Sequence, residues 1–299
     1  MIRLSKERSV YSLSADAPPA ARVSLGETLE LETADCFAGQ IAAPGLAPAA
    51  IDWERINPAT GPVFVEGVGR GDVLTVLVER VDVADRGVMA VSPEFGVTRD
   101  RFRETSFEVI VIEQGIAALP GGARAPIEPM IGVIGVAPSG APVACGSPGA
   151  HGGNMDTRLI GEGATVYLPV SSPGALLAAG DLHALMGDGE ICGTGVEVAG
   201  RVTLRVDVRR GLELTNPVVD TAEVVATIAS AETLDEAADR ATRDMAELLS
   251  LRLGLPAAHA SMLMSAAGRL RVSQVVDPLK TARFEMPKTV LSTLGDDLI

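Results

Sequence analysis

The chain has 299 residues, of which 47% are hydrophobic and 21% charged, a globular composition that excludes a mainly disordered chain. The formal net charge is −14, and no concentrated basic patch interrupts it, which argues against nucleic acid as a partner. The sequence shows neither a membrane-length apolar run nor the apolar region of a signal peptide. We therefore expect a cytoplasmic protein with no membrane partner.

Alternation of apolar and polar residues, the pattern of half-buried strands, recurs along most of the chain. It predicts strands over residues 27–33, 72–83, 107–113, 164–170 and 222–228. Residues 195–208 are predicted to form a hairpin, with a turn at 199–201 between two alternating runs. Clusters of Gly and Pro separate these segments, as turns require.

Helical signals are concentrated after residue 230. Thr233 and Glu236 fit a capping box, and apolar residues then recur at helical spacing as far as Leu253. Pro256 starts a second predicted helix, which runs to about residue 268 and is followed by strand and loop.

These patterns predict a mainly β fold with an α/β portion, that is, an α+β protein with a sandwich-like or barrel-like core and C-terminal helices. We expect one unit over residues 1–299, with room for two interleaved subdomains. The β-rich part would cover residues 1–229 and the helix-containing part residues 230–299.

Groups that can carry chemistry gather in one Gly-rich stretch, residues 151–197. It holds His151 and His183, and within it Asp181-x-His183 is followed by Asp188-x-Glu190. In an extended chain residues i and i+2 point to one face, so each pair can present two ligands, or an acid and a base. Histidine nitrogen with carboxylate oxygen suits zinc, whereas oxygen alone suits calcium or magnesium. On spacing alone, Gly-Asp-Gly is equally well explained as a turn.

Cysteine chemistry is a competing hypothesis. Cys192 lies two residues after Glu190 and is a candidate nucleophile beside an acid. The interpretation we favour is a small packed residue at the start of a strand. Three cysteines at long spacings form neither a disulfide framework nor a Cys-x-x-Cys metal site, in keeping with a reducing compartment.

Several stretches together resemble the acetamidase/formamidase family, and they follow one another along nearly the whole chain. They are residues 35–37 (DCF) with 39–40 (GQ), 57–62 (NPATGP) with 65–67 (VEG), 131–138 (IGVIGVAP), 151–157 (HGGNMDT), 180–190 (GDLHALMGDGE) and 270–278 (LRVSQVVDP). The resemblance implies hydrolysis of a short-chain aliphatic amide, of the acetamide or formamide type, to a carboxylate and ammonia. It also implies a homo-oligomer and a divalent metal, zinc or calcium.

Read with this resemblance, the residues predict an amide carbonyl attacked by a metal-activated water. The expected metal ligands are Asp181 and His183, with Asp156, His151, Asp35 and Glu66 as further candidates.

The remaining roles fall to three residues of the same stretch. Glu190 would act as general base and then as acid, with Asp188 as its possible substitute, and Asn154 would donate to the oxyanion. Two alternatives stay open: a metal-independent amidase using Cys192, and a non-catalytic, metal-stabilised β-protein that binds a small ligand.

Overall fold

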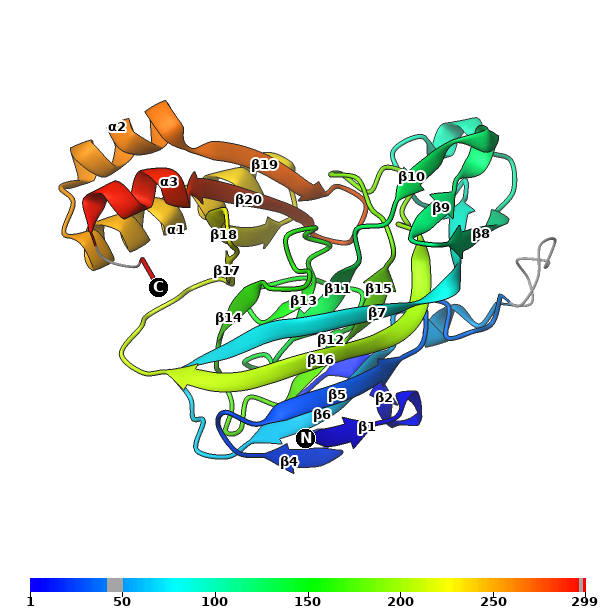
Figure 1. The fold of residues 1–299 in the computed structure, drawn as a ribbon, viewed down its shortest axis with the longest axis horizontal. Helices are drawn as coiled ribbons and strands as arrows, with labels where there is room; N and C mark the ends of the chain where they lie inside the picture. Colours follow the sequence, from blue (N-terminus) through cyan, green and yellow to red (C-terminus); the bar gives the residue numbers. More distant parts are fainter. Residues whose placement is uncertain (42–50, 296–297) are drawn as a thin grey trace.

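A computed structural model describes residues 1–41, 51–295 and 298–299. The chain forms a β-rich body, with its α-helices gathered near the C-terminal end (Figure 1). This confirms the prediction of a mainly β fold with C-terminal helices. The strands of the described ranges do not close into a barrel.

Two long antiparallel strands, β7 (Val73–Val91) and β16 (Glu197–Arg209), run side by side through the body (Figure 1). β5 (Thr28–Thr33) pairs with β16, and β8 (Ser106–Glu113) and β14 (Thr165–Pro169) pair with β7. Alternate residues of these strands are buried in one large Val-, Leu- and Ile-rich cluster. The period-2 pattern of the sequence therefore marks real strands, although β7 extends well beyond its predicted end at residue 83.

The hairpin predicted over residues 195–208 is wrong, because this segment is the single strand β16. Gly200, placed in the predicted turn, instead pairs with Thr33 of β5 and Val83 of β7. A Cβ atom at Gly200 would lie 2.3 Å from the backbone oxygen of Asp82. The glycine thus serves the close approach of two strands at an irregular register rather than a reversal of the chain.

The strand that carries most of the chemistry is β15 (Leu177–His183), which is buried along its whole length. It lies between β11 (Met130–Gly135) and β6 (Ala59–Val65), and its last residues pair with the start of β16. β13 (Gly152–Asn154) pairs with the other side of β11. Because of this pairing, different parts of the Gly-rich stretch, namely β13, β15 and the start of β16, lie close together near the end of β15.

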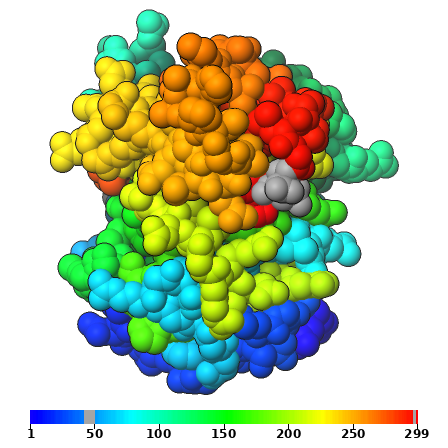
Figure 2. Space-filling model, turned by 90° about the vertical axis from the view of Figure 1, so that its left-hand side faces the viewer, coloured from blue at the N-terminus to red at the C-terminus, as the bar shows by residue number. Residues whose placement is uncertain are grey.

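The C-terminal region adds β17 (Val218–Asp220), β18 (Val224–Ala231), β19 (Arg269–Gln274) and β20 (Lys280–Pro287). α1 (Leu234–Leu253) packs against β18 and β20. Further along the chain come α2 (Ala257–Ala267) and the short α3 (Lys288–Leu291), which the sequence did not predict. Figure 2 looks onto this end, with α1 and α2 in yellow to orange above the blue N-terminal strands. The side chain of Thr233 accepts a hydrogen bond from the Glu236 backbone N–H, which confirms the predicted helix start.

Short elements complete the described chain. The strands are β1 (Ile2–Leu4), β2 (Ser9–Val10), β3 (Ser12–Leu13), β4 (Ala21–Val23), β9 (Ile116–Ala118), β10 (Arg124–Pro126) and β12 (Val143–Ala144). Single 3-10 turns cover Lys6–Arg8, Trp53–Arg55, Arg99–Arg101, Pro120–Gly122 and Ser292–Leu294. Among the helices that the structure describes, none has the length and apolar character needed to cross a bilayer.

Candidate active site

A buried imidazole surrounded by carboxylates lies at the end of β15. The Nε2 atom of His183 is 3.7 Å from Oδ1 of Asp181, so the structure brings this predicted pair together. Asp156 and Glu190 join them, at 3.8 and 4.0 Å from the same nitrogen. These four residues and Glu197, at 3.2 Å, are called the carboxylate cluster below.

Strand pairing explains how Glu197 enters the cluster. His183 and Glu197 lie directly opposite each other in the antiparallel β15–β16 pair, where facing side chains are close neighbours. One carboxylate oxygen of Glu197 accepts a hydrogen bond of 2.7 Å from the Gly195 backbone N–H, and the other faces the imidazole. Sequence reasoning did not select Glu197, because its partner is set by the register of two strands.

Several polar atoms of the carboxylate cluster are buried without a hydrogen-bond partner among the described residues. They are both carboxylate oxygens of Asp156, Oδ1 of Asp181, Oε2 of Glu197 and both ring nitrogens of His183. Unpaired buried oxygens of this kind cost free energy unless a cation or proton binds there. The set therefore has the character of a ligand shell rather than of a finished hydrogen-bond network.

The electrostatics of the carboxylate cluster support this interpretation. Burial raises the pKa of Asp156 and the pKa of Glu197, each to about 7, and burial with the Asp156 charge raises the pKa of Glu190 well above its usual value. Burial lowers the pKa of His183, but the Glu197 and Asp181 carboxylates outweigh it and raise this pKa overall. Positive charge in the cluster is thus strongly favoured.

Glycine at position 132 leaves room for two of these carboxylates. A Cβ atom there would lie 2.5 Å from Oδ1 of Asp156 and 2.8 Å from Oδ2 of Asp181. Gly132 belongs to β11, which pairs with β15, so the backbone of one strand forms a wall of the cluster. This packing explains the need for glycine at one position of the IGVIGVAP stretch.

Cys36 also reaches the carboxylate cluster, which its sequence neighbours do not indicate. Its thiol, one oxygen of Asp181 and one of Glu197 lie within 4.8 Å of one another, and all three residues are buried. Burial and the carboxylates raise the pKa of the Cys36 thiol well above its ordinary value. Without a cation this thiol stays protonated, whereas a bound metal would favour the thiolate.

A second group of polar residues supports the carboxylate cluster. Asn154 donates from Nδ2 to Asp277 at 3.0 Å, and Asn57 donates from Nδ2 to Asp181 at 3.3 Å. Burial raises the pKa of Asp277 well above its ordinary value. Sequence reasoning missed Asp277 and Asn57 as site residues, although both stand in stretches that carry the family resemblance.

The carboxylate cluster opens into a cavity of about 600 Å³. Asp181, Glu190, Glu197, Asn154 and Asp277 line this cavity, together with Asn57 and a set of apolar side chains. Asp156 and His183 are buried and do not line the cavity. The cavity is large enough for a small organic molecule, and it places carboxylates of several different segments against that molecule.

Two sequence candidates lie near the carboxylate cluster but are occupied by other partners. Both carboxylate oxygens of Asp188 accept from Nη2 of the buried Arg283, each at 2.9 Å. The carboxylate of Asp35 accepts the backbone N–H groups of Phe37 and Gly39 at 2.9 and 3.1 Å. Asp188 therefore anchors its turn, and Asp35 holds the turn that carries Cys36.

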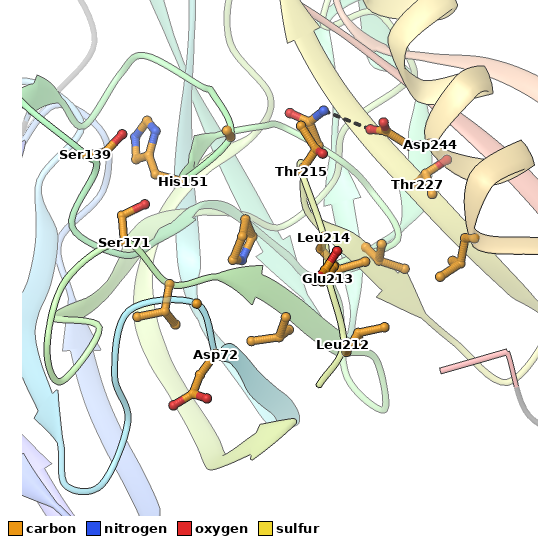
Figure 3. A pocket seen from close by; sticks show the side chains of 18 of the residues that line it. Asp72, Ser139, His151, Ser171, Leu212, Glu213, Leu214, Thr215, Thr227 and Asp244 are labelled. Atoms are coloured by element: carbon orange, nitrogen blue, oxygen red, sulfur yellow. Dashed lines mark hydrogen bonds between the residues drawn. The ribbon is translucent and has the colours of Figure 1, made fainter. Parts of the chain in front are cut away.

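Two further candidates lie apart from the carboxylate cluster. Glu66 sits at the surface in an ion pair with Arg22, with 2.8 Å between the charged atoms. His151 lines a different cavity, of about 650 Å³. Figure 3 shows His151 beside Ser139 and Ser171, with Asp244 on the far side of that cavity. His151 and Asp156 are close in sequence, but the strand β13 lies between them, and they belong to different parts of the fold.

The environment of His151 leads to a prediction about pH. The side chain is only 8% exposed, and burial lowers its pKa to about 4. Between about pH 6.5 and 4 the unfolded chain takes up a proton at this position that the folded protein does not, so stability falls as pH falls. Going from pH 7 to pH 5, the wild type should lose about 2 kcal/mol more unfolding free energy than His151→Gln. Urea unfolding of both proteins at the two pH values checks this, and equal losses would contradict it.

Cys192 does not present its thiol to the cavity that adjoins the carboxylate cluster. Its Sγ donates to the Thr194 backbone oxygen at 3.4 Å, while the neighbouring Gly193 and Thr194 line that cavity. The half-buried thiol thus packs against its own loop.

The sequence and the fold are similar to those of known proteins. The sequence profile of the Acetamidase/Formamidase family matches residues 6–144 and 141–292. The chain is 50% identical to a predicted acetamidase/formamidase of Thermoanaerobacter tengcongensis, with a TM-score of 0.96 over 98% of both chains. The chain is 46% identical to an acetamidase of Bacillus halodurans, with a TM-score of 0.95. That match covers 98% of this chain and 100% of the acetamidase.

A curated formamidase of Methylophilus methylotrophus is 27% identical over 253 residues. That match covers 64% of this chain and 61% of the formamidase, so the chain spans about three fifths of the length of such curated relatives.

Proposed function

The chain belongs to the acetamidase/formamidase family, and we propose that it hydrolyses a primary amide to a carboxylate and ammonia at the carboxylate cluster. The observation that supports this most directly is the set of unpaired, buried ligand atoms at one end of a cavity open to small molecules. The solved relatives, which match nearly the whole chain, are named for acetamide and formamide.

The donor set fits a divalent cation. Asp156, Asp181, His183 and Glu197 would hold it, with the Cys36 thiol beside them. An imidazole nitrogen and a thiol among carboxylates favour zinc over calcium, which prefers six to eight oxygen ligands. When bound, zinc would polarise the amide carbonyl and lower the pKa of a water molecule to about 7.

Glu190 is the residue we assign to proton transfer. Its carboxylate lines the cavity where the substrate would lie, whereas Asp156 and His183 do not line it. In this role Glu190 takes a proton from the attacking water and gives it to the departing nitrogen. Addition of the water oxygen forms the new C–O bond and gives a tetrahedral oxyanion. When this adduct collapses, the C–N bond breaks and ammonia leaves with the transferred proton.

Asn154 is the proposed oxyanion donor. One side-chain N–H of Asn154 donates to Asp277, and this hydrogen bond fixes the orientation of the Asn154 side chain. The second N–H can then donate to the substrate oxygen. Asp277 therefore acts as a positioning residue in this scheme.

The proposal extends to the setting of the enzyme. We propose that it works in the cytoplasm, and that it forms a homo-oligomer, as the family resemblance implies. Its three free cysteines agree with a reducing compartment. The mass of the purified protein in solution tests the assembly.

Ammonia release tests the proposed activity and the metal together. Formamide, acetamide and propionamide should release ammonia with the protein as purified. A chelator should abolish that release and lower the melting temperature, because an ion bound to the folded state stabilises it. Zinc should restore both. Release that is indifferent to chelation would refute the metal proposal, and no release from any amide would refute the hydrolase proposal.

A further inference from the structure

Aromatic side chains, which are scarce in this chain, concentrate at the cavity that adjoins the carboxylate cluster. The sequence holds six Phe, two Tyr and one Trp. Four of these nine, Tyr11, Phe37, Trp53 and Phe95, line that cavity. Hydrolysis of acetamide or formamide alone gives no reason for such an enrichment.

Two of these rings form a wall at the solvent side. Trp53 and Phe95 meet edge to face with their centroids 6.2 Å apart, and Trp53 is 40% exposed. Phe95 is held against the backbone of Gly193, where a Cβ atom would lie 2.6 Å from the ring. A tryptophan left this exposed beside an active cavity offers apolar surface to a ligand.

The size of the cavity also indicates a substrate larger than acetamide. Acetamide has four non-hydrogen atoms and fills on the order of 100 Å³, the room of a few water molecules. The cavity measures about 600 Å³. Most of it would stay filled with water around acetamide, whereas a substrate with a ring would displace that water from apolar walls.

The charges of the lining narrow the substrate class further. Among the described residues, the charged side chains of this cavity are all acidic: Glu54, Asp181, Glu190, Glu197 and Asp277. No described Lys, Arg or His side chain lines it. These carboxylates would repel an acyl group that carries a second carboxylate, so the acyl group is not anionic.

We propose that the substrate is a neutral primary amide whose acyl group carries an aromatic ring, and that this ring packs against Trp53 and Phe95. The amide end then reaches the buried carboxylate cluster, while the ring stays at the exposed side of the cavity. This inference rests on the proposed amide hydrolysis and names the substrate class of the same site.

Trp53 is the only tryptophan of the chain, so its fluorescence reports binding at this cavity without any turnover. Glu190→Gln is titrated with phenylacetamide, acetamide and the anion succinamate, and ammonia release from the same amides is measured with the wild type. We expect phenylacetamide to saturate the fluorescence change at a concentration at least about tenfold lower than acetamide, with no change from succinamate. Wild-type kcat/KM should favour phenylacetamide over acetamide by a similar factor.

Phe95→Ala in the Glu190→Gln background should weaken phenylacetamide binding about tenfold. Phe64→Ala is the matched control, because that ring stacks under Arg22 and does not line this cavity. Equal affinities for the two neutral amides, or an equal effect of the two Phe variants, would overturn the inference even if acetamide is hydrolysed. Tight phenylacetamide binding without ammonia release would instead overturn the hydrolase proposal and leave the aromatic site standing.

Discussion

Gly132→Ala should reduce kcat/KM for amide hydrolysis by about 100-fold or more and lower the metal content of the purified protein. The added methyl group would lie within 2.8 Å of carboxylate oxygens from both Asp156 and Asp181. Both residues are buried, Asp156 completely and Asp181 except where it faces the cavity. Overpacking of this kind also costs about 1–3 kcal/mol of stability. Kinetics, metal analysis by mass spectrometry and thermal unfolding measure the three effects.

Gly187→Ala is the matched control for this substitution. Gly187 lies in the loop that leads to Glu190, but apart from its own chain neighbours no heavy atom lies within 4 Å of where its Cβ would be. Activity and metal content should therefore stay near the wild-type values, with a stability change below about 1 kcal/mol. If Gly132→Ala kept full activity, the backbone of β11 would not be what fixes the two carboxylates.

Glu190→Gln should lower kcat by about 100- to 10,000-fold, the usual contribution of a general acid–base group. Glutamine keeps the shape of the side chain and removes the group that accepts and returns the proton. Removing one of several buried carboxylates relieves repulsion, so we expect the melting temperature to stay within about 4 °C of the wild type. Steady-state kinetics and calorimetry on one preparation separate the two effects.

Asp188→Asn tests whether the neighbouring acid shares this role. Its carboxylate faces Arg283, so its loss should cost about 1–3 kcal/mol of stability while most of the turnover remains. The two variants should thus show opposite patterns, one losing activity and the other stability. A loss of turnover in Asp188→Asn as deep as that in Glu190→Gln would show that the pair acts together.

Local signals in the sequence predicted the part of the site that is local. Asp181 and His183 share one strand, and Glu190 lies on the turn that follows. Alternation and Gly placement marked them as candidates, and the family resemblance then selected them. Asp188 shares the same spacing, yet its carboxylate is taken by Arg283, which comes from β20. Nothing near Asp188 in the sequence reveals that partner.

The remaining residues of the site depend on long-range packing. Glu197 reaches His183 through strand register, Cys36 comes from a turn near the start of the chain, and Asp277 comes from the β19–β20 connection. The fold shows the same limit. Alternation of apolar and polar residues predicted the strands, and the capping box predicted the start of α1. Gly200, however, was predicted to form a turn, whereas it lies where two strands approach each other closely. Glycine has several physical uses, and only the partner strand decides between them.

The link between Gly189 and the C-terminal region has a consequence for the order of events during synthesis. The Gly189 backbone N–H donates to Ser273, and the Val275 N–H donates back to Gly189, so the turn that carries Glu190 is held by a segment translated much later. Asp277, just beyond that segment, supplies part of the cavity wall. A nascent chain can therefore complete β15 and gather most of the cluster while still lacking this support. Such distant contacts form slowly, and the ribosome-bound chain should remain inactive until its last strands emerge and pair.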